Sequence, residues 1–385
     1  MKVLWLCSWY PNKLKPYDGD FIQRHARAVS LLHNIHAIHI VKNEDRIITK
    51  RLFEETTITG NLTETIIYYR SLKTGIRILD QLLSANRYNQ LLKKASKKYL
   101  FANRDCRIVH VHVAMKAGYV ALWLKRKYSI PYIVSEHWTG FLSNAKPNVR
   151  DRSMQWKRVM RKVLANAEKI TCVSKVLANA ITEQVRDLKI DIIPNVVDTN
   201  IFYPVVKTSA EITTFIHIST MTYQKNIETM MEAVRILKKT DHHFILNLFV
   251  PEVDRIKTLV KRYELEDVII VHGEIIQLKL VKYIQQSDAL VLYSRYETFG
   301  CVVIEANACG VPAILSDLQV FQEYCVDGFN ALIVPGNDAT ELSKAMRKMI
   351  EHGSNFDAAT IARYTAEKFG YPVIANKFDE IYQSI

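Results

Sequence analysis

The sequence has no long apolar run, no paired cysteines and no repeated or low-complexity segment. No stretch reaches the roughly 18 apolar residues of a membrane-spanning helix, so we expect none. The start, MKVLWLCSWYPNK, is apolar only briefly and has no small-residue cleavage site, which indicates a strand rather than a signal peptide. The six cysteines show no CxxC spacing and lie mostly in apolar runs, so we expect buried free thiols and a cytoplasmic location.

Apolar residues make up 49% of the 385 positions, which is enough for the cores of two ordinary domains. The charge is uneven. Residues 1–200 contain 34 Lys and Arg against 16 Asp and Glu, whereas residues 201–385 contain 18 against 23. A strongly basic first half predicts an anionic partner, which could be nucleic acid, a membrane surface or a phosphate-bearing substrate.

Short β-branched runs alternate with longer amphipathic segments along both halves of the chain. We expect strands at 2–7, 35–41, 65–69, 108–113, 131–137, 169–174 and 190–195, then at 213–219, 244–250, 268–273, 289–294, 312–317 and 330–335. Nearly continuous apolar strands separated by helices are typical of buried parallel sheets. The pattern predicts two Rossmann-like α/β domains, 1–198 and 199–368. A C-terminal helix, 369–385, packs on its own domain or crosses back to the first.

Two carboxylates stand eight positions apart in the segment SRYETFGCVVIEANACG. Glu297 is expected in the loop that follows a strand, and Glu305 inside the short helix that follows the loop. The backbone N–H groups of Phe299, Gly300 and Cys301 would mark the helix start, where the dipole favours anions. Ionised carboxylates suit sugar hydroxyls, which donate hydrogen bonds to them. The alternative is a capping acid and a solvated helix acid.

The segment YETFGCVVIEANACGVPAI resembles the Glu-x7-Glu signature of the GT4 family of retaining, nucleotide-sugar-dependent glycosyltransferases. The similarity extends to FQEYCVDGFNALIVP, to IPNVVDTNIF at the domain junction and to ISTMTYQKNIETMMEAV. It spans most of the chain and is strongest from Pro194 to Met346. The resemblance implies a GT-B fold, in which two Rossmann-like domains face each other and the active site lies in the inter-domain cleft.

The resemblance also implies roles for individual residues of the second domain. Glu305 would hold the nucleotide ribose, and Glu297 the hydroxyls of the donor sugar, as a catalytic and donor-binding residue. The amides from Phe299 through Gly300 to Cys301 would meet sugar and phosphate, and Lys225 would bind the diphosphate.

This chain departs from the family pattern at two places. The Gly-Arg pair that usually precedes the lysine is replaced by Ser219 and Thr220, so another basic residue would have to supply the second positive charge. The family's Gly-Gly pair is replaced by Leu318 and Gln319.

In the first domain, Gly19 matches a glycine-rich turn near donor and acceptor, although proline and aspartate around a glycine also make an ordinary turn. His137 follows a predicted strand and matches a histidine that is often called catalytic. His110 and His112 share one face of a strand, but the sequence shows no third ligand beside them. We therefore expect no metal site, and the family implies neither a metal nor another cofactor.

The basic first half contains the amphipathic segment 150–169 and the lysine cluster 93–98. Either could contact an anionic membrane surface, and either could equally be a core helix with a solvated cationic face. No RRM or zinc-finger pattern supports nucleic-acid binding. We expect a peripheral protein on the inner membrane face.

Taken with the resemblance, the sequence predicts a retaining hexosyltransferase that uses a UDP- or GDP-sugar and a saccharide or lipid-linked acceptor in surface polysaccharide or glycoconjugate assembly. The alternatives are a nucleotide-sugar 2-epimerase of the same fold, a non-catalytic homologue, and a basic binding protein.

Overall fold

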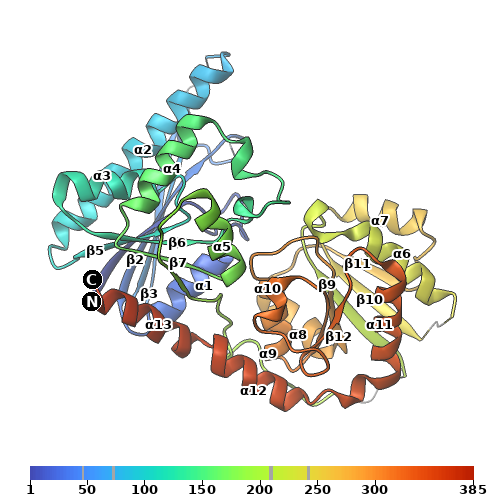
Figure 1. Cartoon of the computed structure of the whole chain (residues 1–385). Coiled ribbons are helices and arrows are strands. Elements are labelled where there is room, and N and C mark those ends of the chain that lie inside the picture. The colour runs from blue at the N-terminus through green and yellow to red at the C-terminus, as the bar shows by residue number, and fades with distance from the viewer. Residues whose placement is uncertain (46, 72–73, 208–210, 241–242) are drawn as a thin grey trace. The chain divides into compact units, whose positions relative to one another are not determined.

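A computed structural model describes residues 1–45, 47–71, 74–207, 211–240 and 243–385 (Figure 1). The chain divides into two compact units. The first comprises Met1–Ser143, Pro147–Val196 and Tyr371–Ile385, and the second comprises Asn144–Lys146 and Val197–Gly370. The first unit is therefore built from parts of the chain that are far apart in sequence.

The first unit contains an eight-stranded sheet in the order β3-β4-β2-β1-β5-β6-β7-β8. Its strands are β1 (Lys2–Cys7), β2 (Asn34–Lys42), β3 (Leu52–Thr59), β4 (Leu62–Tyr69), β5 (Ile108–His112), β6 (Tyr132–Glu136), β7 (Lys169–Cys172) and β8 (Ile190–Ile192). All neighbours are parallel except β3, which runs antiparallel to β4. The seven strands predicted in this half are confirmed.

Strand β3 was not predicted from the sequence. Its sequence, LFEETTIT, is mostly polar, and most of its side chains are exposed. At the sheet edge β3 needs only the backbone hydrogen bonds of β4 on one side, so it carries no apolar pattern that would reveal it.

The first sheet is accompanied by helices α1 (Asp20–Val29), α2 (Arg77–Ala102), α3 (Gly118–Tyr128), α4 (Met154–Ala165), α5 (Lys175–Gln184) and α13 (Tyr371–Gln383), with 3-10 turns η1 (Thr139–Phe141) and η2 (Val149–Asp151). Helix α13 packs beside α1 and buries Ile374, Phe378 and Tyr382 in the first core. The indole N–H of Trp5 donates to the Tyr382 hydroxyl at 3.2 Å. The C-terminal helix thus belongs structurally to the first unit.

The second unit contains a fully parallel sheet in the order β11-β10-β9-β12-β13-β14. Its strands are β9 (Thr213–Ile218), β10 (Phe244–Phe249), β11 (Ile269–His272), β12 (Ala289–Leu292), β13 (Ala313–Ser316) and β14 (Ala331–Val334). Its helices are α6 (Ile227–Lys238), α7 (Val253–Arg262), α8 (Gln277–Gln286), α9 (Cys301–Ala308), α10 (Gln319–Gln322), α11 (Ala339–His352) and α12 (Ala358–Phe369), with 3-10 turns η3 (Tyr223–Lys225) and η4 (Gly353–Asn355). The six strands predicted here and the two parallel α/β domains are confirmed.

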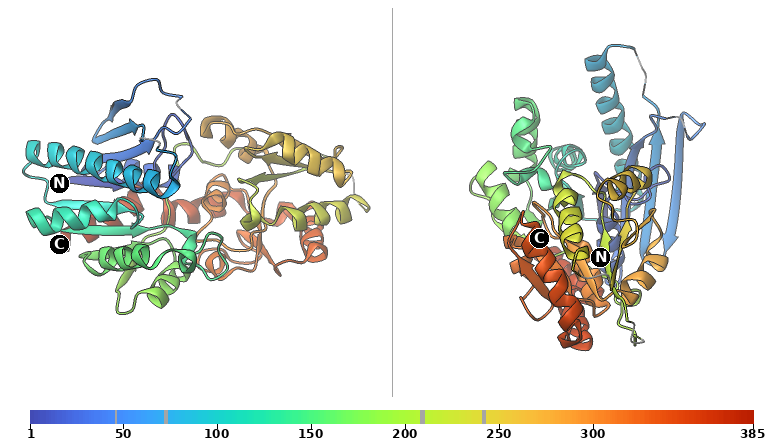
Figure 2. Two further views of the ribbon diagram at one scale, coloured as in Figure 1. Left: turned by 90° about the horizontal axis from the view of Figure 1, so that it is seen from above. Right: turned by 90° about the vertical axis from the view of Figure 1, so that its right-hand side faces the viewer.

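Helices α4 and α2 of the first unit differ in how much of their length they bury. Helix α4 buries Met160, Val163 and Leu164, so its apolar face belongs to the core, as the alternative interpretation of segment 150–169 had it. Helix α2 buries side chains only from Tyr88 onward, and its first turns project past the other elements of the unit (Figure 2). Within the described residues, no helix is both long and apolar enough to cross a bilayer.

Candidate functional site

The predicted donor residues of the second unit gather where β9 and β12 end. Lys225 is the last residue of η3, and Glu297 lies in the loop between β12 and α9. The Lys225 ammonium lies 2.5 Å from Glu297 Oε1, and the Ser294 hydroxyl donates to the same oxygen at 2.9 Å. Both charged side chains are largely buried, Glu297 to 6% exposure and Lys225 to 17%. Residues 72 positions apart in sequence therefore form one charged pair at the carboxyl edge of the sheet.

Glu305 lies in the middle of α9 and is only 2% exposed. Its neighbours Val303, Ile304 and Ala306 are fully buried. An ionised carboxylate is rarely buried without a specific partner or purpose. The interpretation of Glu305 as a solvated helix acid is therefore wrong.

The backbone at the helix start that precedes Glu305 is held in one conformation by close packing. Gly300 has φ of 93°, and a Cβ there would lie 2.9 Å from a Phe321 ring carbon. Phe299 is buried and stacks on Tyr324 with ring centroids 4.7 Å apart. Only backbone atoms of Phe299 can therefore serve a ligand. Cys301 begins α9, and the start of a helix favours anionic groups.

Arg295 is a basic residue at this edge that the sequence analysis did not single out. Its backbone N–H donates to the Gln224 carbonyl at 2.7 Å, and its side chain donates to the Tyr223 carbonyl at 2.6 Å. The guanidinium also lies over the Tyr223 ring, 4.4 Å from the centroid. Arg295 thus lies against the turn that ends in Lys225. Its position two residues before Glu297 could have indicated from the sequence that it lies at this site.

The predicted histidine of the first unit lies at the carboxyl edge of that sheet. His137 directly follows β6 and is 7% exposed. The buried Glu136 carboxylate accepts N–H groups of Ala114, His137 and Trp138 at 2.9–3.0 Å and so fixes the backbone there. Burial lowers the pKa of His137 well below its ordinary value, and the neighbouring His25 and His110 act in the same direction. His137 is therefore neutral near pH 7.

Three buried histidines meet at this edge. Ring nitrogens of His25, His112 and His137 lie within 4.8 Å of one another, from α1, the end of β5 and the end of β6. The sequence showed no third ligand beside the pair His110 and His112; the structure brings His25 and His137 to His112 alone, because α1 and the end of β6 supply residues distant in sequence. The His110 ring lies beside that of His112, with centroids 4.1 Å apart, but its ring nitrogens contact Tyr382 Oη and Ser135 Oγ at 2.7 Å each.

Gly19 precedes α1 and has φ of 68°. A Cβ at this position would lie 2.7 Å from the Trp9 carbonyl carbon and 2.9 Å from the Tyr10 nitrogen. Backbone conformation and close packing on the Trp9–Tyr10 segment therefore already require glycine. The structure accounts for Gly19 as a turn residue, and its contact with a donor stays a prediction.

A cavity of about 200 Å³ opens at the same carboxyl edge. Aromatic walls come from Trp138 and Trp156, whose ring centroids are 5.7 Å apart. Arg152 lies over both rings, and Lys116 and Glu136 also line the space. Aromatic rings flanked by charged groups suit a sugar ring that carries an anionic substituent.

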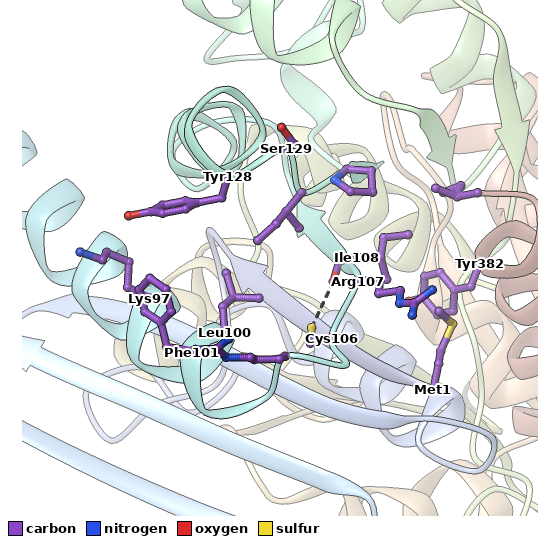
Figure 3. Close-up of a pocket in the computed structure, with 14 residues that line it drawn as sticks. Met1, Lys97, Leu100, Phe101, Cys106, Arg107, Ile108, Tyr128, Ser129 and Tyr382 are labelled. Carbon is purple, nitrogen blue, oxygen red and sulfur yellow. Dashed lines mark hydrogen bonds between the residues drawn. The ribbon is translucent and has the colours of Figure 1, made fainter.

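A larger cavity of about 740 Å³ lies at the opposite edge of the first sheet (Figure 3). Its lining includes Met1, Ile108 and Pro131, which stand at the amino ends of β1, β5 and β6. Figure 3 also shows Lys97 and Phe101 of α2 facing it. Ligands of open α/β sheets bind beyond the carboxyl ends of the strands, so we assign the site to the other edge in spite of the volume.

Comparison with known proteins agrees with this architecture. The family model described as "Glycosyltransferase Family 4" matches residues 63–201, and the model described as "Glycosyl transferases group 1" matches residues 206–369. Together the two models account for most of the chain and meet near the boundary between the two units.

Three known proteins illustrate the similarity. N-acetyl-alpha-D-glucosaminyl L-malate synthase of Bacillus anthracis is 25% identical over 312 residues, which is 76% of this chain and 79% of the relative. A Bacillus subtilis protein named provisionally as the teichuronic acid biosynthesis glycosyltransferase TuaC is 21% identical, with 100% and 94% covered. The structure of Anabaena Alr3699/HepE in complex with UDP is similar with a TM-score of 0.74 at 16% identity, over all of both chains.

Proposed function

The chain belongs to the GT4 glycosyltransferases and has the GT-B fold, and we propose that it moves a hexosyl group from a nucleoside-diphosphate donor to an acceptor hydroxyl with retention. The observation that carries this proposal is the carboxyl edge of the second sheet. There Lys225 contacts Glu297 in the loop before α9, and Glu305 is buried within α9. The resemblance of the Glu-x7-Glu segment supports the retaining course.

The second unit binds the donor. The ammonium of Lys225 has three N–H donors, so it can keep its contact with Glu297 while it reaches a phosphate oxygen. Arg295 supplies the second positive charge in place of the family arginine that Thr220 replaces. Glu305 accepts the ribose hydroxyls, and the N–H groups at the start of α9 meet the donor diphosphate and sugar. We propose UDP as the nucleotide, because HepE was solved with UDP.

The first unit binds the acceptor. The cavity between Trp138, Trp156 and Arg152 stacks a saccharide ring and pairs with an anionic group on it. His137 is neutral, so it exchanges hydrogen bonds with a hydroxyl of the donor sugar rather than acting as a cation.

Departure of the nucleoside diphosphate leaves new negative charge on the phosphate oxygen. Lys225, Arg295 and the α9 amides stabilise that charge, and the departing phosphate assists the acceptor hydroxyl by accepting its proton. These groups replace a divalent metal at the diphosphate, so the reaction is metal-independent.

We further propose that the enzyme works on surface polysaccharide or glycoconjugate at the inner face of an anionic membrane, with a saccharide or lipid-linked acceptor. The basic excess of residues 1–200 supports a peripheral contact. The name of the TuaC relative supports the polysaccharide role.

Thermal unfolding with UDP- and GDP-sugars tests the donor site. A donor at about 100 times its dissociation constant should stabilise the fold by roughly 2.7 kcal/mol, which is several degrees. The shift should disappear in Glu305→Ala and remain in Glu266→Ala, which changes an exposed acid of the same unit. If neither nucleotide sugar shifts the wild type, the proposed function is wrong.

A further inference from the structure

We infer that the start of helix α2 inserts into the surface of an anionic lipid bilayer and holds the carboxyl edge of the first sheet against it. We call the four side chains that carry this contact the apolar tip: Ile76, Ile78, Leu79 and Leu82. The membrane contact itself follows from the surface described below. Its use in delivering a lipid-linked acceptor rests on the proposed function.

The apolar tip is large and exposed for such a short segment. Ile76, Ile78, Leu79 and Leu82 are 62%, 71%, 40% and 63% exposed. At about 3.6 residues per turn, Ile78, Leu79 and Leu82 occupy one half of the helix circumference, and Ile76 directly precedes the helix. Arg77, Asp80, Gln81 and Ser84 occupy the other half. Single exposed apolar residues are ordinary, whereas a contiguous apolar half-helix marks an interaction site.

The helix start is firmly built, so the exposure does not reflect fraying. Asp80 accepts the backbone N–H and the hydroxyl of Thr74 at 2.6 and 2.8 Å. Two residues beyond Leu82, Ser84 contacts the Tyr69 hydroxyl through both its Oγ and its carbonyl oxygen, at 3.1 Å each. From Tyr88 onward α2 buries side chains against the unit. The tip is therefore a preformed projection on an anchored helix (Figures 1 and 2).

A further exposed apolar residue, outside the tip, stands at the same edge of the sheet. Ile47 is 68% exposed in the segment that follows the carboxyl end of β2. Arg70, just past the carboxyl end of β4, donates to the Ile48 carbonyl at 2.7 Å and so ties this segment to the chain leading into α2. Two connections at one sheet edge thus present apolar side chains outward.

The charge around the apolar tip indicates what binds to it. Near the tip α2 carries Arg77 and Arg87 and the acid Asp80, its other four basic residues lie in its second half, and residues 1–200 have an excess of 18 positive charges. An exposed apolar helix start on a domain with a large positive charge suits an anionic lipid interface. The tip is a few side chains wide, whereas a stable protein partner usually covers about 800 Å². An anionic bilayer therefore fits better than a protein.

The apolar tip lies at the same sheet edge as the proposed acceptor site, so membrane contact there could bring the site to a lipid-linked acceptor. Helix α2 begins after the carboxyl end of β4, and His137 and the tryptophan-lined cavity lie beyond the carboxyl ends of β5 and β6 in the same parallel sheet. An acceptor sugar that is attached to a lipid through an anionic phosphate would stay close to the membrane. The inserted tip would bring this edge to the level of such a headgroup.

The test is co-sedimentation of the full chain with vesicles of phosphatidylcholine, with and without phosphatidylglycerol. We expect binding that requires the anionic lipid. Ile78→Glu combined with Leu82→Glu should weaken it by roughly a hundredfold, since each buried aliphatic side chain contributes about a factor of ten or more. Two matched controls, Ile58→Glu on β3 and Leu278→Glu on α8, change residues that are 72% and 62% exposed and should bind as the wild type does.

A second readout follows insertion directly. Tryptophan at position 82, in Leu82→Trp, should be quenched by lipids brominated on their acyl chains, and a tryptophan in Ile58→Trp should not. Equal vesicle binding by the tip variant and the controls would overturn the inference. The inference would also be overturned if the wild type were a dimer and the tip variant a monomer, because the tip would then bind a second copy of the chain.

Failure of this inference is separable from failure of the proposed function. The tip variant should keep the thermal shift with the donor sugar and its transfer to a short acceptor analogue without the lipid chain. Loss of vesicle binding with both retained supports the inference, whereas absence of any donor response in the wild type would contradict the proposed function alone.

Discussion

The ammonium of Lys225 lies 2.5 Å from the Glu297 carboxylate, and the two side chains are largely removed from solvent. Each group compensates the charge of the other before any donor arrives. Donor binding therefore adds phosphate to an existing charged pair, and does not have to overcome an unpaired buried charge.

Removing one member of this pair should destabilise the second unit. We expect Lys225→Ala to lower the free energy of unfolding by roughly 3 kcal/mol, because it leaves the Glu297 carboxylate buried without its cation. The same variant should lose the thermal response to the donor. Urea unfolding measures the first effect.

The exposed pair Lys344–Glu341 is the control for that measurement, and Lys344→Ala should change the stability far less than Lys225→Ala does. In the variant that combines Lys225→Ala with Glu297→Ala, the loss should be smaller than the sum of the two single losses. Strict additivity would show that the pair contributes nothing as a pair.

Arg295 should act as the second cation for the diphosphate. Arg295→Gln should weaken UDP binding about tenfold or more, since a hydrogen bond to a charged group contributes roughly 1.5–3 kcal/mol. Titration calorimetry measures the change. Arg262→Gln, at the exposed end of α7, should leave the affinity unchanged. Unchanged UDP affinity in Arg295→Gln, with its fold intact, would limit Arg295 to holding the Tyr223 turn.

His217 should make the second unit less stable in acid. Burial, opposed in part by the contact with the Val291 carbonyl, lowers the pKa of His217 to about 4 from its ordinary 6.5. The unfolded chain therefore takes up this proton first as the pH falls. The stability that His217 contributes is complete above pH 6.5 and declines toward pH 4, by about 3 kcal/mol in total.

Urea unfolding at a series of pH values checks this expectation. His217→Gln should flatten the decline between pH 6.5 and 4, and His352→Gln, which changes an exposed histidine, should not. A decline of equal size in wild type and His217→Gln would assign the acid sensitivity to other groups.

Chelation should leave the transfer reaction unchanged, whereas excess Zn²⁺ should inhibit it. Ring nitrogens of His25, His112 and His137 are close enough for a small closing movement to capture Zn²⁺, and the captured His137 could no longer meet the donor. His112→Gln should relieve the inhibition while leaving His137 in place. Loss of activity with EDTA, restored by a metal, would contradict the metal-independent mechanism.

The strand pattern of the sequence was informative because most strands are buried on both faces. Apolar runs such as those of β5 and β12 can be recognised without knowing their neighbours. Strand β3 could not be recognised, because its pairing with β4 uses backbone hydrogen bonds and its own side chains are mostly polar. The start of α2 was also overlooked, since an apolar helix end that stands in solvent has the same composition as a buried one.

The site shows the same division. Glu297 and Glu305 are separated by one short loop and half a helix, so their spacing was readable. The contact of Glu297 with Lys225 and the meeting of His25 with His112 and His137 depend on which strand ends lie side by side. That order is a property of the sheet and cannot be deduced from local spacing.

The placement of α13 in the first unit has a consequence for how the protein is made. A ribosome adds residues in order, so all of residues 197–370 exist before Ile374, Phe378 and Tyr382 do. The second unit can complete its core during synthesis, while Trp5 waits for the hydroxyl of Tyr382. The unit whose synthesis begins first is therefore the one that is finished second, and its half-formed core must be kept from aggregating in the meantime.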